Sequence, residues 1–258
     1  MIYITGDLHN TFDMNHLSVK KMRNYCSWQN SSHEEITSAI ILGDFGLPWY
    51  DCPVDEDGIH PTDKGDKYLL RWLNEKPFNI LAVMGNHENY NMIEKLPEVE
   101  MFGGKVLKVS KNIFYLKRGY FYNIEGKDFL VLGGAESQDK EWRKLNVSLW
   151  EQELWSDEEE NACLSRISEY CTEKGNHVDY IVSHTGSIDG IACIESSCDN
   201  PKYRALYEED KTGITLNPYG TSLIAIKIPL TELETTDIAG FKTWLSTHNT
   251  EVYYPLAT

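Results

Sequence analysis

The chain has 258 residues, of which 41% are hydrophobic and 25% are charged, and its formal net charge is -16. This composition is typical of a globular protein and excludes a mostly disordered chain or a fibrous repeat. Because an acidic chain repels polyphosphate backbones at long range, we expect no groove for a long nucleic acid.

Nothing in the sequence predicts export or membrane insertion. No run approaches the ~20 apolar residues of a membrane span, and residues 1–10 lack the basic start and long apolar stretch of a signal peptide. The six cysteines are too sparse for a disulfide scaffold and include no Cys-x-x-Cys pair. Cys193 and Cys198 are close enough in sequence to pair, but we favour free thiols in a cytoplasmic protein.

The first third of the chain alternates short apolar strands with helical patterns. Strands are predicted at 2–5, 38–42 and 79–83, and a glycine follows each of them closely. Helical spacing of apolar residues predicts an amphipathic helix over 14–29, and residues 68–73 are also predicted to be helical. This alternation indicates βαβ units and a largely parallel sheet.

The rest of the chain is predicted to begin with a β meander and to continue with mixed elements. The meander strands are predicted at 105–109, 113–116, 120–124 and 129–132. The later elements are a helix within 149–172 capped by Ser156, strands at 178–182, 222–228 and 251–255, and a helix at 231–242. No linker divides the sequence, so we predict a single domain over 1–258.

Polar side chains follow the predicted strands where each one ends. The four exits read Gly6-Asp7-Leu8-His9, Gly43-Asp44-Phe45-Gly46, Gly85-Asn86-His87-Glu88 and Ser183-His184. Because the carboxyl ends of strands in an open α/β sheet line the ligand crevice, we expect these side chains to meet at one rim. Taken singly, each motif is an ordinary cap or turn. Four of them at four buried-strand exits favour a functional site.

Asp, His and Asn together are ligands that suit Mn, Fe or Zn better than Ca or Mg, which favour all-oxygen cages. A bridging aspartate can hold two ions about 3.5–4 Å apart. Such a pair activates a water and neutralises the oxygens of a phosphoryl group. A dinuclear metal centre is therefore feasible at these exits.

This series of motifs resembles the calcineurin-like metallophosphoesterase superfamily, over residues 6 to about 188. Asp44-Phe45-Gly46 and the run 85–89 resemble a bacterial and phage branch of small members. The resemblance implies a four-layer α/β/β/α sandwich of two mixed β sheets flanked by helices, to which the meander contributes part of the second sheet. It also implies hydrolysis of a phosphomonoester or phosphodiester by a metal-activated water.

The resemblance also implies a metal ligand for most of the exit residues. Asp7 and His9 would ligate one metal, Asp44 would bridge both, and Asn86 and His184 would ligate the second.

The remaining exit residues would act on the substrate or on the loop. His87 would be a non-ligand imidazole that stabilises the transition state or protonates the leaving oxygen. Glu88 would orient His87 or its loop.

The sequence departs from the family pattern in its last motif, Gly-His-x-His, which is absent. In the register of residues 241–250, His248 takes the place of the first histidine and Thr250 stands where the second is expected. A hydroxyl is a poor ligand for these metals, so we expect the site of Asp7 and His9 to bind its ion weakly. Residues 186–258 are thus atypical for the family.

Two interpretations follow. The first is an unaided dimetal phosphoesterase with two divalent ions, Mn first and Fe or Zn as alternatives, acting on a small phosphoester, a nucleotide or a phosphoprotein loop. The second is a catalytically weakened binding or regulatory protein on the same scaffold, with one intact metal site. In a third arrangement, Asp189 or Cys193 completes the first metal site.

Overall fold

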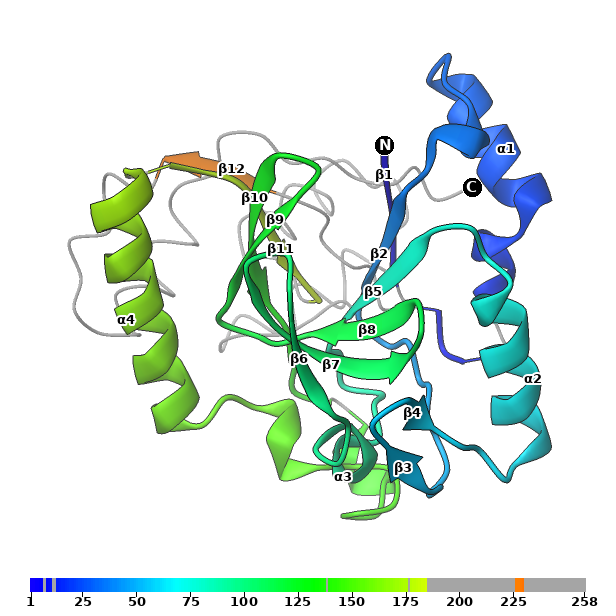
Figure 1. Cartoon of the computed structure of the whole chain (residues 1–258). Coiled ribbons are helices and arrows are strands. Elements are labelled where there is room, and N and C mark those ends of the chain that lie inside the picture. The colour runs from blue at the N-terminus through cyan, green and yellow to red at the C-terminus, as the bar shows by residue number, and fades with distance from the viewer. Residues whose placement is uncertain (7, 11–12, 138, 176, 185–225, 230–258) are drawn as a thin grey trace, which may run out of the picture.

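The protein is an α/β sandwich in four layers, with two β sheets packed between helices (Figure 1). The computed structural model describes residues 1–184 apart from positions 7, 11–12, 138 and 176, together with the backbone of 226–229. Helices α1 and α2 cover the outer face of the first sheet, and α4 covers the second sheet on the opposite side (Figure 1). The predicted architecture is confirmed.

The first sheet has six strands in the order β1-β2-β5-β8-β7-β6. These are β1 (Ile2–Thr5), β2 (Ser38–Leu42), β5 (Asn79–Val83), β8 (Ile113–Leu116), β7 (Gly104–Ser110) and β6 (Glu98–Met101). The first four are parallel neighbours, and the last two pair antiparallel. Ile4 pairs with Ile40, which pairs with Leu81, so β1, β2 and β5 end at the same edge of the sheet.

The second sheet has the order β12-β11-β10-β9. Its strands are β9 (Phe121–Ile124), β10 (Lys127–Leu132), β11 (His177–Ser183) and β12 (Ile226–Pro229). The predicted meander is therefore divided, because β7 and β8 complete the first sheet while β9 and β10 begin the second. β10 and β11 run parallel, which places the end of β11 beside the end of β10.

The helices are α1 (Val19–Trp28), α2 (Lys64–Asn74), α3 (Tyr90–Ile93) and α4 (Asp157–Lys174). Single-turn 3-10 helices lie at Met14–Leu17, His33–Glu35, Lys140–Trp142 and Glu151–Glu153, and a small hairpin joins β3 (Val54–Asp55) to β4 (Gly58–Ile59). Hydrophobic periodicity did not predict α3, β6 or the hairpin, all of which are short.

Two helix predictions need correction at their ends. The stretch 14–29 is not one helix, because Ser18 is extended and its hydroxyl caps α1 by accepting from the backbone N–H of Lys21. Ser156 caps α4 in a reciprocal capping box with Glu159, as predicted. Leu154, which lies inside the stretch predicted to be helical, precedes the helix and is exposed.

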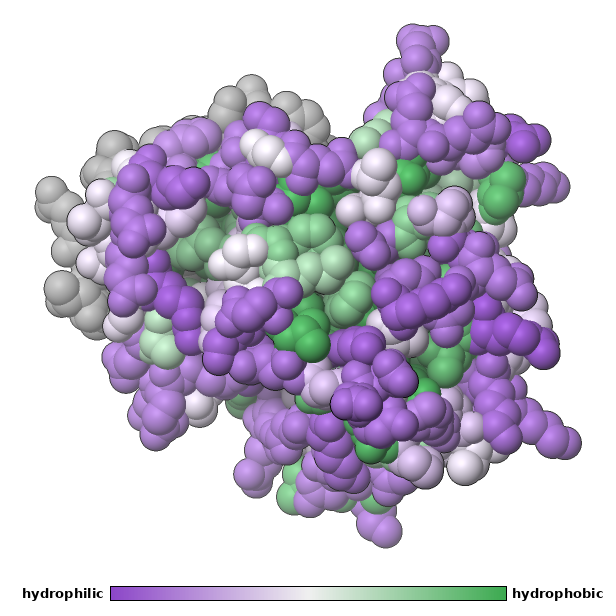
Figure 2. Space-filling model, viewed as in Figure 1, coloured by the Kyte–Doolittle hydropathy of each residue, from purple (hydrophilic) through white to green (hydrophobic). Residues whose placement is uncertain are grey.

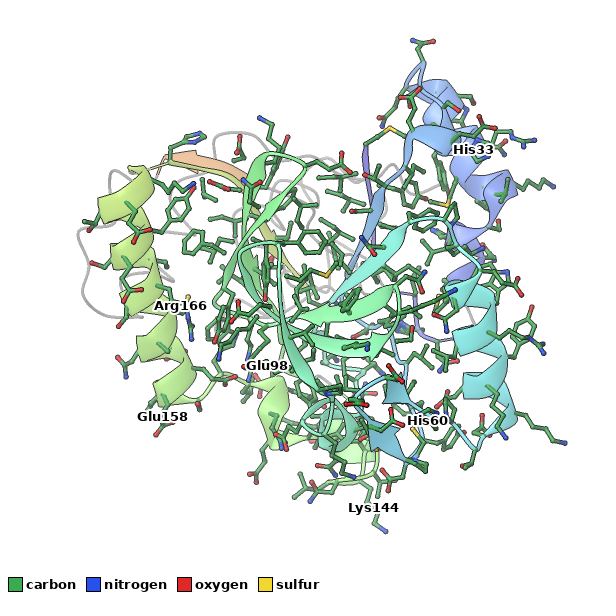
Figure 3. All side chains as sticks on the ribbon, in the orientation of Figure 1. His33, His60, Glu98, Lys144, Glu158 and Arg166 are labelled. Atoms are coloured by element: carbon green, nitrogen blue, oxygen red, sulfur yellow. The ribbon has the colours of Figure 1, made fainter. Side chains whose placement is uncertain are left out.

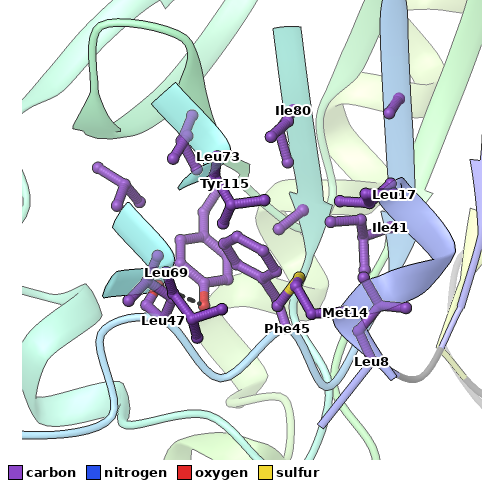
Figure 4. Packing of buried hydrophobic residues seen from close by; sticks show 14 of the residues in the cluster. Leu8, Met14, Leu17, Ile41, Phe45, Leu47, Leu69, Leu73, Ile80 and Tyr115 are labelled. Atoms are coloured by element: carbon purple, nitrogen blue, oxygen red, sulfur yellow. Dashed lines mark hydrogen bonds between the residues drawn. The ribbon is translucent and has the colours of Figure 1, made fainter. Parts of the chain in front are cut away.

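Side chains of the central strands alternate between two cores. Ile41 and Ala82 pack toward α1 and α2, whereas Ile40 and Leu81 face the second sheet. Figure 4 shows the helix-side core, where Leu69 and Leu73 of α2 pack beside Tyr115 of β8. Hydrophilic side chains dominate the outer surface on the face shown in Figure 2.

The predicted helix 231–242 and strand 251–255 lie outside the described residues, as do residues 222–225 of the strand predicted before them. Among the residues that the structure describes, no helix combines the length and the apolar character that a bilayer crossing requires.

Leu73→Ala tests the contact of α2 with the sheet. Leu73 is fully buried, so its truncation leaves a cavity and we expect the free energy of unfolding to fall by about 2–5 kcal/mol. Tyr68 lies on the same helix but is 55% exposed, and Tyr68→Ala should change stability by only about 0.5 kcal/mol. Urea denaturation measures both; equal losses would contradict this packing.

Candidate functional site

Asp44 lies at the centre of the polar cluster, directly beyond β2, with only 2% of its side chain exposed. Its Oδ1 accepts the backbone N–H of His87 at 2.9 Å and lies 3.3 Å from Nε2 of His184. Its Oδ2 lies 3.7 Å from Nε2 of His9. Burial opposes ionisation, but the imidazoles of His184, His87 and His9 hold the pKa of Asp44 below its ordinary value. The carboxylate therefore connects three chain segments as an anion.

Two glycines allow this close approach. A Cβ on Gly85 would lie 2.1 Å from Oδ1 of Asp44, and a Cβ on Gly43 would lie 2.1 Å from Nδ1 of His184. Gly43 also has a φ of +89°, which disfavours other residues. The glycines at the strand exits are thus required by the side chains that pack against them.

His184 follows β11 in the second sheet and reaches across to the end of β2. Its Nδ1 donates to the carbonyl of Leu42 at 2.8 Å, an assignment that makes Nε2 of the neutral ring an acceptor. This Nε2 lies 3.0 Å from Oδ1 of Asn86 and 3.3 Å from Oδ1 of Asp44. Three lone-pair atoms on three segments therefore converge, which suits a divalent cation.

His9 and His87 form the other half of the cluster. Their rings stack with centroids 4.9 Å apart, and the backbone N–H of His9 donates to the carbonyl of Asp44 at 2.7 Å. Ligand atoms of His9, Asp44 and His87 all lie within 4.8 Å of one another. Burial lowers the pKa of His87, and Arg143 and His9 lower it further, while Asp44 acts in the opposite direction.

Glu88 holds the loops beneath these side chains. It is fully buried and accepts backbone N–H groups of Phe45 and Gly46 at 2.9 Å each and of Gly85 at 3.4 Å. The Tyr115 hydroxyl donates to it at 2.8 Å. Glu88 was expected to orient His87 or its loop; its bonds go to the backbone of the loops that carry Asp44 and Asn86.

A third group of residues comes from the irregular segment between β10 and α4. Gly134 donates to the carbonyl of Met84 at 2.7 Å, which brings this segment across the end of β5. Ser137 accepts from Nδ2 of Asn86 at 3.1 Å and donates to the buried carboxyl of Glu153 at 2.5 Å. These bonds turn the Oδ1 of Asn86 toward His184.

Arg143, from the same segment, places its guanidinium against Asn86 and His87. Its Nη1 donates to the carbonyl of Asn86 at 3.1 Å and to Ser137 Oγ at 3.0 Å. Its Nη2 contacts both ring nitrogens of His87, with Nδ1 at 2.8 Å. Sequence reasoning did not find Ser137, Arg143 or Glu153, because no motif or period marks a segment with so little regular structure.

The structure brings together five of the predicted site residues: His9, Asp44, Asn86, His87 and His184. Asp7 and His248, together with Thr250 and the alternatives Asp189 and Cys193, lie outside the described residues.

Gly85→Ala tests whether close packing sets the position of Asp44. The added methyl would overlap Oδ1 of Asp44, so we expect the carboxylate to move and the affinity for Mn²⁺ to fall about tenfold or more. Gly103→Ala is the control for affinity: nothing lies within 4 Å of its Cβ, so the strain that its φ of +81° brings lowers stability without displacing Asp44. Isothermal titration with Mn²⁺ compares the two; unchanged affinity in Gly85→Ala would contradict the arrangement.

Glu88 predicts a pH dependence of the metal-free protein. Burial first, and the charge of Asp44 next, raise the pKa of Glu88 from 4.5 to about 7. Between these values the folded state holds more protons than the unfolded chain, so the free energy of unfolding falls as pH rises from about 4.5 to about 7. Denaturation in EDTA should show the wild type losing stability relative to Glu88→Gln over this window. A constant difference would contradict the assignment.

The chain was compared with protein-family models and with curated proteins. The family model described as calcineurin-like phosphoesterase matches residues 1–218, and no curated protein matches the sequence. The match covers the strands of both sheets up to β11 and every residue of the cluster around Asp44. The chain therefore belongs to the calcineurin-like phosphoesterase family, whose members are metal-dependent phosphoester hydrolases.

Proposed function

We propose that the protein hydrolyses phosphoesters at a dinuclear metal centre held by the side chains around Asp44. The observation that carries this proposal is the convergence of Asp44, Asn86 and His184, whose lone pairs lie 3.0–3.3 Å apart around the Nε2 of the histidine. Such a set is stabilised by a cation placed among its members. Family membership supplies the reaction class.

Each ligand has a defined place in this proposal. Asp44 offers one oxygen to the side of His184 and the other to the side of His9, as a bridging carboxylate must. Asn86 and His184 hold one ion and His9 helps to hold the other, with Asp7 and His248 as further proposed ligands. Divalent ions in this position supply a nucleophilic water at neutral pH and neutralise phosphoryl oxygens.

His87 acts on the substrate. Nη2 of Arg143 contacts both ring nitrogens and can only donate, so whichever nitrogen accepts from it, the other one carries the proton of the neutral imidazole. That N–H donates to the oxygen on which charge develops as the ester bond breaks. The lowered pKa of His87 keeps the ring neutral at physiological pH.

The finer features of the activity are proposals of the same kind. The mixed nitrogen and oxygen donors favour Mn²⁺ over Mg²⁺, with Fe or Zn as alternatives. The strongly acidic chain favours a small phosphoester, a nucleotide or a phosphoprotein loop over a long nucleic acid. The cytoplasm is the compartment that suits the free cysteines of the described residues, Cys26, Cys52, Cys163 and Cys171.

A second candidate is a weakened member that binds a ligand or partner without efficient turnover. The absence of a Gly-His-x-His motif from the sequence favours it, because the ion beside His9 would then lack a second imidazole ligand. Turnover that depends on His87 separates the two candidates.

Hydrolysis of p-nitrophenyl phosphate and bis-p-nitrophenyl phosphate with added Mn²⁺ tests the proposal. We expect Asp44→Asn to abolish turnover through loss of metal, and His87→Ala to lower kcat about 100-fold or more while metal content is kept. His60→Ala is the control, since this exposed histidine pairs with Asp55 on the hairpin (Figure 3). Its activity should equal that of the wild type.

Two outcomes would contradict the proposal. Absence of turnover in a wild-type protein that holds two ions per chain would favour the binding protein. Turnover that persists in both Asp44→Asn and His87→Ala would place the chemistry elsewhere.

A further inference from the structure

Arg143 is a nearly buried cation at the site of a strongly acidic protein. Only 6% of its side chain is exposed. Among the described residues, no other arginine or lysine hydrogen-bonds to Asn86 or His87. A guanidinium this buried, in contact with Asn86 and His87, is placed to act at the site.

The guanidinium is fixed from one side. Nε pairs with Asp139 at 2.7 Å, and Nη1 donates to the carbonyls of Asn86 and Ser148 and to Ser137 Oγ, all at 3.0–3.1 Å. The carboxylate of Glu153 lies 3.8 Å from Nη1. Asp139 and Glu153 thus both lie at the Nε and Nη1 end of the guanidinium.

The other end, Nη2, is directed at the catalytic imidazole. Its contacts among the described residues are the ring nitrogens of His87. Nη2 carries two hydrogens, of which a ring nitrogen takes one. A neutral imidazole is a weaker acceptor than an anionic phosphoryl oxygen, with which guanidinium forms short, charge-assisted hydrogen bonds.

We propose that Nη2 of Arg143 binds a non-bridging phosphoryl oxygen of the substrate beside His87, and that this contact selects dianionic phosphomonoesters over phosphodiesters. A monoester presents one more anionic oxygen than a diester, so a fixed cation stabilises it more. This inference rests on the proposed function, since it places the scissile phosphorus next to His87.

Titration of inorganic phosphate and of dimethyl phosphate into the Mn²⁺-loaded protein tests the contact without turnover. Arg143→Met should weaken phosphate binding about tenfold or more, the loss expected for a charge-assisted hydrogen bond, and should weaken dimethyl phosphate less. Arg143→Lys keeps the charge but loses the planar fork, so its affinity for phosphate should lie between those of the wild type and Arg143→Met. Lys144→Met is the matched control, because Lys144 is exposed and its side chain points away from the protein (Figure 3).

Activity supplies the second readout. The ratio of kcat/KM for p-nitrophenyl phosphate to that for bis-p-nitrophenyl phosphate should fall about tenfold in Arg143→Met and stay constant in Lys144→Met. Thermal unfolding and Mn²⁺ content verify that each variant is folded and loaded. If Arg143→Met is unfolded or lacks Mn²⁺, the same ratio in Arg143→Lys is compared with that of the wild type, and a lower ratio supports the proposal.

Three results would overturn the proposal. The first is a wild-type protein that binds no phosphate, and the second is an Arg143 variant that binds phosphate as the wild type does. The third is an equal loss for both esters, which would make Arg143 a positioning residue for His87. If the wild type binds phosphate but hydrolyses neither ester, the proposed function is wrong. The phosphate titrations then still test whether Arg143 binds the phosphoryl oxygen.

Discussion

The buried carboxylate of Asp44 is the interaction on which the site depends. An ionised aspartate that is removed from water must find donors or cations nearby, because burial alone costs several kcal/mol. The backbone N–H of His87, which donates to Oδ1, meets part of that need. A divalent ion between Asp44 and His184 would meet the rest.

Beneath this carboxylate, the fold fixes the loops rather than the side chains themselves. Parallel pairing of β1, β2 and β5 brings three strand ends to one edge, and the second sheet brings His184 to the same place. Glu88 then ties the loop after β2 to the loop after β5 through three backbone N–H groups. Asp44 has a positive φ of 51°, which is unfavourable for a residue other than glycine, and these hydrogen bonds stabilise the loop in that conformation.

Much of this arrangement can be predicted from the sequence because it follows strong local signals. Apolar runs that end near Gly6, Gly43 and Gly85 predict parallel strands, and parallel strands place the residues after them together. The packing role of Gly85 is not visible in sequence, since it depends on the distance to a side chain forty residues away. The division of the meander between two sheets likewise depends on tertiary pairing.

The contribution of the segment between β10 and α4 could not be predicted. Its residues Ser137, Arg143 and Glu153 act through single hydrogen bonds to Asn86, to His87 and to one another, and such bonds leave no periodic signal. The segment is held where it is by Arg118, whose guanidinium binds Glu159 and the carbonyl of Leu154. The site is therefore built from strand-end residues that the motifs predict and from a segment laid across them that no motif marks.

Anomalous diffraction from a crystal soaked in Mn²⁺ tests the central claim most directly, because it locates the ion without reference to any substrate. We predict a peak bounded by Asp44, Asn86 and His184, and a second, weaker peak on the His9 side of Asp44. No peak beside Asp44 in a crystal that shows Mn²⁺ elsewhere on the chain would contradict it.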